Sequence, residues 1–308
     1  MKIENILIAG PHEFDFQPYL KQLEQYNLRF KSTDVVSQED MNWADTYVGF
    51  APNENFEPSK VKWVHTFNAG VNNYLAISGW DNTLLTRTIS DFGEKMSEYC
   101  LSYILADLQY HSQFKEQQKA KVWSVKSPGS LKDQTITILG TGEIGQKIAE
   151  VFSTFGATVN GISNSGQDKV YFNQISNIEN AHTILERSDY IISTLPLTQD
   201  TEKLLNQHHF NYLNNAYFIN VGRGKVVDTD HLLDALDEGK LRHVVLDVFE
   251  SEPLTEDSEL WQRKDVTITP HISALTDIDD AISCFCNTLK KLENNESVSN
   301  QVDFNKGY

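Results

Sequence analysis

Short apolar runs, separated by polar or helix-patterned stretches, dominate the first hundred residues of the chain. Leu20, Leu23 and Tyr26 recur at helical spacing between the first two runs. Strands that alternate with helices are typical of a parallel α/β sheet. The strands that this pattern predicts lie at residues 3–9, 28–31, 46–50, 61–67 and 83–86.

The pattern changes near Glu94, where apolar side chains begin to recur every three or four positions, as far as about Tyr110. This spacing predicts one long helix with an apolar face. A polar stretch follows at residues 111–121, and residues 123–129 are expected to form a loop, since Pro128-Gly129 is typical of a turn.

A second α/β array begins with a strand at residues 135–139, followed by a helix with Ile144, Ile148 and Phe152 on one face. We therefore predict an α/β protein with two parallel-sheet domains, and we expect the last helix to return the chain to the first domain. The further strands are predicted at 157–162, 190–194, 216–221, 243–248 and 266–269, and the further helices at 230–238 and 276–292.

Length and composition limit the possible classes of protein. The 308 residues are enough for two domains, and 43 acidic against 26 basic side chains give a net charge of −17. This charge argues against a nucleic-acid binder, because phosphate binding needs clustered Lys and Arg. Three cysteines, Cys100, Cys284 and Cys286, cannot form a disulfide framework and make a poor metal site, so no metal is expected.

The chain shows no signal-peptide pattern and no run near the ~18 apolar residues that span a bilayer. We therefore expect a soluble, cytoplasmic protein that does not bind membranes.

A glycine-rich turn follows the predicted strand at 135–139 and opens the next helix. Its pattern, Gly-x-Gly-x-x-Gly, permits a tight turn, close approach of a pyrophosphate and close packing of helix on strand. The helix N-terminus adds free N–H groups and a positive dipole end. The candidate contacts to a dinucleotide are Gly140, Thr141, Gly142, Glu143, Ile144 and Gly145.

The end of the next predicted strand reads Ser163-Asn164-Ser165 and carries no carboxylate. An Asp or Glu at this point usually binds the ribose 2′-hydroxyl of NAD. Asp168 comes later, Lys169 is the nearest cation, and hydroxyl and amide groups can bind a 2′-phosphate. We predict that the protein prefers or tolerates NADPH, and the use of NADH as its cofactor stays an open alternative.

Three loops that each follow a predicted strand carry the candidate catalytic groups. Arg223 lies between two glycines, His271 follows Thr269-Pro270, and Glu252 precedes a proline. A guanidinium can hold a 2-keto acid, and an imidazole paired with a carboxylate can protonate its carbonyl oxygen. Glu250 and Glu256 compete with Glu252 for this pairing, and spacing alone does not choose among them.

Other histidines are poorer candidates. His65 lies within a predicted strand and is expected to be a hydrogen-bonded core residue, whereas His208 and His209 are expected at a solvated helix start.

These segments together resemble the D-2-hydroxyacid dehydrogenase family, the D-isomer-specific NAD(P)-dependent oxidoreductases. The matching stretches are the glycine turn and residues 195–201, 220–224, 246–254 and 269–273, in the family's order. The resemblance implies a Rossmann nucleotide-binding domain at residues 99–275 and a flavodoxin-like substrate domain at 1–98 plus 276–308. It also implies a homodimer, and it favours the glyoxylate/hydroxypyruvate reductase branch.

The resemblance also assigns roles to individual positions. Arg223, Glu252 and His271 fill the family's Arg/Glu/His set. Residues 62–72 resemble its substrate loop, in which the amides of Ala69, Gly70 and Val71 bind the substrate carboxylate, although Asn72 replaces a frequent Asp. The cofactor contacts that it implies, besides the glycine turn and Ser163, Asn164 and Ser165, are Leu195, Pro196, Thr201, Val221, Gly222, Asp247 and Ser273.

The predicted activity is NAD(P)H-dependent reduction of a small 2-keto acid to the D-2-hydroxy acid. One alternative is a non-catalytic nucleotide sensor, like the family's transcriptional corepressors. Another is a dehydrogenase of a different substrate class that requires ammonia. The presence of all three catalytic residue types counts against the sensor.

Overall fold

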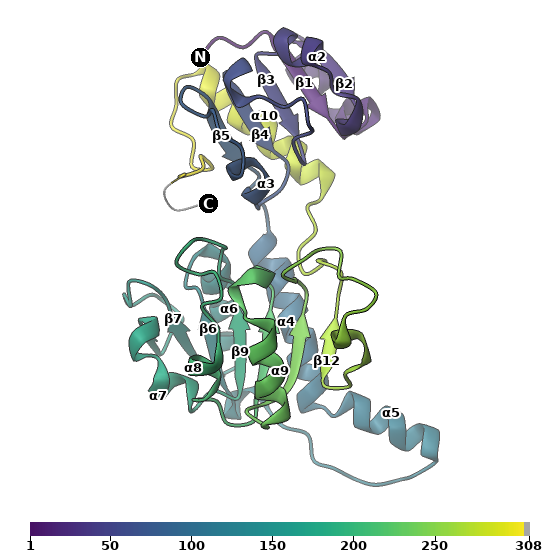
Figure 1. Ribbon diagram of the computed structural model, residues 1–308, viewed down its shortest axis with the longest axis vertical. Helices are drawn as coiled ribbons and strands as arrows, with labels where there is room; N and C mark the ends of the chain where they lie inside the picture. The colour runs from purple at the N-terminus through teal and green to yellow at the C-terminus, as the bar shows by residue number, and fades with distance from the viewer. Residues whose placement is uncertain (305–308) are drawn as a thin grey trace. The chain divides into compact units, whose positions relative to one another are not determined.

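The computed structural model describes residues 1–304. The chain forms two compact units, each with its own parallel sheet (Figure 1). Unit 1 comprises Met1–Ser90 and the segment that starts at Thr276, and unit 2 comprises Asp91–Leu275. The first division therefore lies at residue 90, ahead of the long helix, whereas the sequence had suggested a point inside that helix at residue 98.

Unit 1 contains a five-stranded parallel sheet in the order β2-β1-β3-β4-β5, the flavodoxin-like order. All five predicted strands form, with ends shifted by one or two residues. The strands are β1 (Asn5–Ala9), β2 (Asn27–Lys31), β3 (Thr46–Gly49), β4 (Trp63–Thr66) and β5 (Leu84–Arg87), and the helices are α1 (Leu20–Leu23), α2 (Gln38–Trp43), α3 (Asn72–Leu75) and α10 (Ile278–Glu293).

The C-terminal helix α10 belongs to the core of unit 1. Ala281, Ile282 and Phe285 are buried against the sheet, and the Phe285 ring stacks on Trp63 with ring centroids 5.3 Å apart. After the helix, Gln301 forms an antiparallel bridge with Thr86 at the edge of β5. Unit 1 is therefore built from both ends of the chain.

His65 is the satisfied core histidine that its strand position predicts. It is fully buried, and its Nδ1 lies 2.8 Å from the Thr86 hydroxyl oxygen. The Thr86 oxygen accepts from the Trp63 indole, and the Thr86 proton has His65 Nδ1 as its nearer acceptor, since the Val64 carbonyl lies 3.5 Å away. Nε2 lies 3.4 Å from the Thr88 hydroxyl, which itself donates to a backbone carbonyl. Both ring nitrogens of a neutral imidazole thus have partners.

Unit 2 contains a seven-stranded parallel sheet in the order β12-β11-β10-β9-β6-β7-β8. Its centre has the Rossmann arrangement, in which the strand order reverses beside the first strand, β6. The strands are β6 (Thr135–Leu139), β7 (Thr158–Ile162), β8 (Gln174–Ser176), β9 (Tyr190–Ser193), β10 (Ala216–Asn220), β11 (Leu241–Leu246) and β12 (Val266–Ile268), and the helices are α4 (Phe92–Leu108), α5 (His111–Ala120), α6 (Glu143–Thr154), α7 (His182–Leu185), α8 (Gln207–Phe210) and α9 (Thr229–Asp237).

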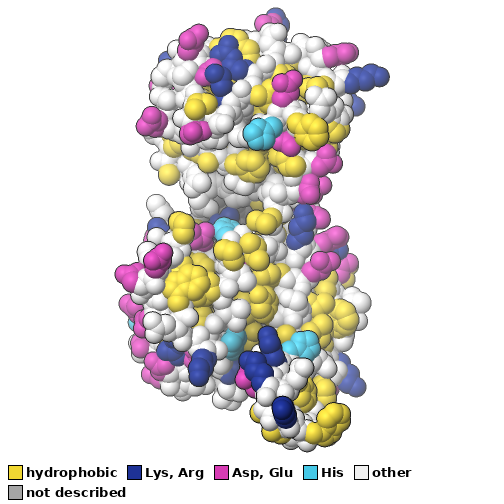
Figure 2. Space-filling model, turned by 90° about the vertical axis from the view of Figure 1, so that its right-hand side faces the viewer, with side chains coloured by type: hydrophobic (Ala, Val, Ile, Leu, Met, Phe, Trp, Pro, Cys, Tyr) yellow, Lys and Arg dark blue, Asp and Glu magenta, His cyan; other side chains and the backbone are white. Residues whose placement is uncertain are grey.

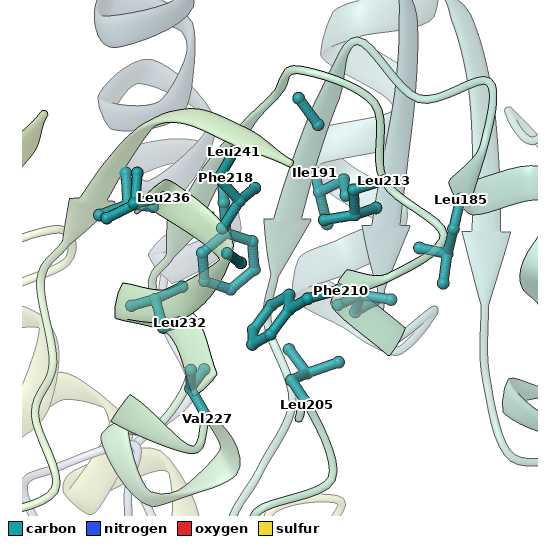
Figure 3. Packing of buried hydrophobic residues seen from close by; sticks show 14 of the residues in the cluster. Leu185, Ile191, Leu205, Phe210, Leu213, Phe218, Val227, Leu232, Leu236 and Leu241 are labelled. Atoms are coloured by element: carbon teal, nitrogen blue, oxygen red, sulfur yellow. The ribbon is translucent and has the colours of Figure 1, made fainter. Parts of the chain in front are cut away.

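Both faces of this sheet are buried. Successive strand residues point to opposite sides, and they belong to two different apolar clusters. Ile191 and Phe218 join one apolar cluster, part of which Figure 3 shows, with Phe210 beneath Phe218. Their neighbours Ile192 and Ile219 join the other cluster, which includes residues of α4 and α6. Continuous apolar strands are what a sheet covered on both faces requires.

Some parts of unit 2 differ from the sequence-based expectation. The stretch at 111–121 was expected only to be polar, but its residues 111–120 form α5, in which no residue is buried. The short strand β8 was not predicted. His209 was expected to be solvated but is half-buried, and its Nδ1 has no hydrogen-bond partner within residues 1–304. The reason is that the adjacent Phe210 anchors the short helix α8 in the apolar core.

No helix among residues 1–304 combines the length and the apolarity that crossing a membrane requires.

Candidate active site

The three candidate catalytic residues follow three neighbouring strands at one edge of the unit 2 sheet. Asn220 pairs with Leu246, and Leu246 pairs with Ile268, so the carboxyl ends of β10, β11 and β12 lie side by side. The loops that carry Arg223, Glu252 and His271 begin within a few residues of these ends. Ligands bind outside the carboxyl ends of the strands in open α/β sheets, so this edge is the expected place for a site.

His271 and Glu252 contact each other directly, since His271 Nδ1 lies 2.8 Å from a Glu252 carboxylate oxygen. The other Glu252 oxygen accepts the backbone N–H of Phe249 at 3.0 Å, which fixes the carboxylate. A carboxylate is an acceptor, so the Nδ1 proton points to Glu252 and Nε2 faces outward. About half of the His271 side chain (51%) is exposed, so this nitrogen can reach a ligand.

The structure also decides among the glutamates that the sequence left open. Glu250 accepts hydrogen bonds from the Thr229 amide and hydroxyl, at 3.2 and 2.7 Å, and so ties its loop to the start of α9. Glu256 is exposed, and Glu252 is the glutamate beside the imidazole.

Arg223 is half-buried in a loop whose backbone is tightly packed. The backbone of Gly224 lies against Phe249, where an added Cβ would come within 1.9 Å of the Phe249 carbonyl carbon. Asn220 spans the loop, accepting the Gly222 N–H and donating to the Arg223 carbonyl. The guanidinium donates to the Gly222 carbonyl at 2.7 Å. Through Phe249, the arginine loop therefore packs against the loop that holds Glu252.

Asp247 is fully buried, and its carboxylate organises the turn that contains His271. One oxygen accepts the Thr269 hydroxyl at 2.6 Å and the Ile272 N–H at 2.8 Å, and the other accepts the Ser273 N–H at 2.9 Å. The His271 N–H donates to the Asp247 carbonyl at 2.9 Å. The resemblance had suggested only a cofactor contact for Asp247, and the sequence carries no signal for this bracing role.

The glycine turn has the shape that a pyrophosphate requires. Gly140 has φ 96°, and a Cβ on Gly145 would lie 1.9 Å from the Gly140 carbonyl oxygen, so both positions need glycine. Nothing lies within 4 Å of a Cβ added to Gly142, whose backbone faces open space at the N-terminus of α6. A twelve-residue helix that starts there presents unpaired N–H groups to an anion. The turn therefore fits a dinucleotide.

Two further segments complete this edge of unit 2. The turn from Leu195 is closed by Thr201, whose hydroxyl donates to the Pro196 carbonyl at 2.6 Å. A Cβ on Gly222 would lie 2.6 Å from the Leu195 carbonyl oxygen, so this turn packs on the loop after β10. Val221 and Ser273 are buried at the same strand ends.

The ribose end of the candidate cofactor site follows β7. The Ser163 hydroxyl accepts the Gly166 N–H at 3.2 Å and closes a turn that exposes Asn164 and Ser165. The Lys169 ammonium donates to the Thr141 carbonyl at 2.6 Å, so it lies beside the glycine turn.

The candidate substrate loop lies in unit 1, directly after β4. The Asn68 side chain donates to the Phe50 carbonyl at 2.8 Å, and the Val71 carbonyl accepts from the first turn of α3. Within residues 1–304, the N–H groups of Ala69 and Gly70 have no hydrogen-bond acceptor. Two adjacent free amides can bind a carboxylate.

The family model that matches this chain is "D-isomer specific 2-hydroxyacid dehydrogenase, NAD binding domain", and the match covers residues 101–273. The chain belongs to the D-isomer specific 2-hydroxyacid dehydrogenases. Such a dehydrogenase is an NAD(P)-dependent oxidoreductase, which agrees with the prediction from the motifs.

Solved structures similar to this dehydrogenase match it over almost the whole chain. One from Aeromonas salmonicida subsp. salmonicida A449 is 31% identical, covers 98% of this chain and 100% of its own, and has a TM-score of 0.84. One from Xanthobacter autotrophicus Py2, in complex with NADPH and MES, is 26% identical, covers 100% of both chains and has a TM-score of 0.89.

A third similar structure is an NADPH-dependent glyoxylate/hydroxypyruvate reductase from Sinorhizobium meliloti, in complex with NADP and sulfate. It is 26% identical, covers 100% of both chains and has a TM-score of 0.87. The fold prediction of two parallel-sheet α/β domains is confirmed by these matches.

Proposed function

We propose that this dehydrogenase reduces a small 2-keto acid to the D-2-hydroxy acid with NAD(P)H. The observation that carries the proposal is the 2.8 Å contact between His271 and Glu252, on the sheet edge that also holds Arg223 and the glycine turn. The D configuration follows from the family. We assign unit 2 to the nucleotide and unit 1 to the substrate, so residues 91–98 move from the predicted substrate domain (1–98 plus 276–308) to the predicted nucleotide domain (99–275).

In this mechanism the amides of Ala69, Gly70 and Val71 hold the substrate carboxylate, and the Arg223 guanidinium binds and polarises the C2 carbonyl. Bound NAD(P)H supplies the hydride that C2 accepts. As negative charge develops on the carbonyl oxygen, His271 Nε2 donates a proton to it. Glu252 keeps the imidazole in the required tautomer and stabilises its charged form. The products are the 2-hydroxy acid and the oxidised cofactor.

Replacing His271 with Ala tests this assignment. Because general acid catalysis contributes typically 10²–10⁴-fold, we expect kcat to fall by about that factor, measured from NAD(P)H absorbance with a panel of 2-keto acids. His208→Ala, at an exposed histidine of the same unit, is the matched control and is expected to keep the wild-type rate.

An unchanged rate in His271→Ala would remove this histidine from the mechanism. Cofactor binding without turnover by the wild type would indicate the sensor instead, and activity that requires ammonia would indicate a different substrate class.

We further propose that the protein is a homodimer that pairs through an arm consisting of α5 and residues 121–129. This arm extends away from the unit 2 sheet (Figure 1). Trp123 is 96% exposed, Val125 is 87% exposed and Val122 is 53% exposed. Figure 2 shows apolar and lysine side chains together at the lower end of the molecule, where α5 lies. Large apolar side chains that are exposed together on one short segment are typical of interaction surfaces.

The charge of the arm favours a second copy of the chain as its partner. The arm carries four lysines (residues 115, 119, 121 and 126) and one glutamate (residue 116), a net charge of +3, whereas the whole chain carries −17. The arm is also held in shape, since Lys126 lies over the Tyr110 ring at 3.6 Å and donates to Gln113 at 3.0 Å.

A further inference from the structure

One chain of hydrogen bonds connects the long helix α4 to the turn that carries His271. The Tyr99 hydroxyl oxygen lies 2.6 Å from the Thr269 hydroxyl oxygen, which lies 2.6 Å from an Asp247 carboxylate oxygen. Thr269 has a single hydroxyl proton and donates it to Asp247. Tyr99 must therefore be the donor to Thr269, so the direction of the chain is fixed.

We infer that Tyr99 is a positioning residue, whose hydroxyl acts through Thr269 and Asp247 to hold the His271 turn in its working geometry. This inference rests on the proposed role of His271 as the proton donor. The Tyr99 hydroxyl bonds to Thr269, so it acts on His271 through its partners and is a positioning residue, not a catalytic one.

The His271 turn needs such support. His271 adopts φ 54°, a left-handed conformation that side chains with a Cβ rarely take, and such a conformation persists only where surrounding contacts determine it. All four residues that set the turn are held by one aspartate: Thr269 by its hydroxyl, His271 by its N–H to the Asp247 carbonyl, and Ile272 and Ser273 by their N–H groups.

At the other end of this chain of hydrogen bonds, the Tyr99 side chain is held in place by its neighbours. Tyr99 lies one helical turn from Tyr103, and the two rings pack with centroids 4.9 Å apart. Burial raises the pKa of the Tyr99 hydroxyl far above its usual value, so it remains a protonated donor at every working pH. At the start of the same helix, the Lys95 ammonium donates to the Leu275 carbonyl, four residues after His271. Helix α4 thus contacts the His271 segment at two points.

The test compares Tyr99→Phe and Thr269→Val, which remove one hydroxyl each, with Thr269→Ser, which keeps it. Tyr99→Phe removes one hydrogen bond of the chain and is expected to lower kcat about five- to tenfold, with KM for the keto acid changed less than about twofold. Thr269→Val removes both hydrogen bonds of the Thr269 hydroxyl and is expected to lower kcat at least as much. Thr269→Ser is expected to restore the rate. The double variant Tyr99→Phe with Thr269→Val should be no slower than Thr269→Val alone, because both substitutions interrupt the same chain of hydrogen bonds.

Tyr190→Phe is the matched control, since it removes a hydroxyl bonded to Asp107 at 2.7 Å in the same unit, outside this chain of bonds. A readout independent of turnover is the NMR resonance of the His271 ring Cε1–H. We expect it to move in Tyr99→Phe and Thr269→Val, and to stay in place in Tyr190→Phe.

A wild-type kcat and an unmoved His271 resonance in Tyr99→Phe overturn the inference, as do losses that multiply in the double variant. If the wild type reduces none of the 2-keto acids, the proposed function fails. The NMR comparison then decides the positioning role on its own.

Discussion

At the scale of single residues, cofactor choice depends on the turn after β7. The ribose end offers Ser163, Asn164 and Ser165 in place of a carboxylate, and the Lys169 ammonium is held at 2.6 Å from the Thr141 carbonyl. Hydroxyl, amide and ammonium groups suit a 2′-phosphate, whereas a carboxylate would repel it.

We expect kcat/KM to be at least about tenfold higher with NADPH than with NADH, since a bound phosphate adds charge-assisted hydrogen bonds. Lys169→Ala should reduce this ratio by lowering the NADPH value alone. Lys240→Ala, a lysine of the same unit that bonds to the Asn211 carbonyl, is the control and should leave the ratio as it is. A strong preference of the wild type for NADH would contradict the prediction.

His65 makes stability depend on pH in a predictable direction. Burial lowers the pKa of His65 from 6.5 to about 3. Below about pH 6.5 the unfolded chain binds a proton at this residue, whereas the folded chain does not until about pH 3. The contribution of His65 to the free energy of unfolding is therefore fully present above about pH 6.5. It decreases as the pH falls, by up to about 1.4 kcal/mol per pH unit for each such histidine.

Urea unfolding of the wild type and His65→Gln between pH 6.5 and 4.5 measures this contribution. We expect the wild type to lose more stability across the range than the variant. Burial also lowers the pKa of His209 and His243, so the variant should retain a shallower slope of the same sign. His208→Gln, at an exposed histidine, should behave like the wild type, and parallel curves for wild type and His65→Gln would refute the argument.

At the scale of elements, the site forms because three parallel strands of the unit 2 sheet, β10, β11 and β12, end side by side. The pairings of Asn220 with Leu246 and of Leu246 with Ile268 bring three loops together although about twenty residues or more separate them in the chain. The glycine turn connects β6 of the same sheet to α6. Substitutions of its glycines test whether this turn binds the cofactor.

Gly142→Ala and Gly145→Ala form a matched pair within this turn. A methyl group at residue 145 would meet backbone at 1.9 Å, so we expect a loss of stability of about 2–4 kcal/mol. A methyl group at residue 142 meets no atom of the protein within 4 Å but occupies the space that a pyrophosphate would approach.

Gly142→Ala should therefore keep the wild-type Tm while the Kd for the cofactor rises about tenfold or more. Thermal unfolding and titration of NAD(P)H fluorescence measure the two quantities. Unchanged cofactor affinity in a well-folded Gly142→Ala protein would show that the pyrophosphate does not lie on this turn.

At the scale of the whole molecule, the proposed dimer explains why a protein with a net charge of −17 exposes a basic, apolar arm. Replacing Trp123 and Val125 by Ser removes the most exposed apolar side chains of the arm without touching a core residue. We expect the wild type to sediment as a dimer and the double variant as a monomer with unchanged circular dichroism. A monomeric wild type, or a variant that still dimerises, would exclude the arm as the interface.

The two α/β arrays could be predicted from the sequence, because the alternation of apolar strands and helices is a local pattern, as is a glycine turn between a strand and a helix. The Arg, Glu and His motifs could be predicted as well, because each follows its own strand. The sequence did not reveal α5, whose side chains bury no apolar face.

The contacts between residues distant in the chain became known from the folded structure. It chose Glu252 over Glu250 and Glu256, since the choice depends on which carboxylate the folded loop directs to His271. It also joined Tyr99 to Thr269 across 170 positions. Hydrogen bonds act over about 3 Å, and the distance in space between such residues is set by strand register and helix packing, which no local pattern encodes.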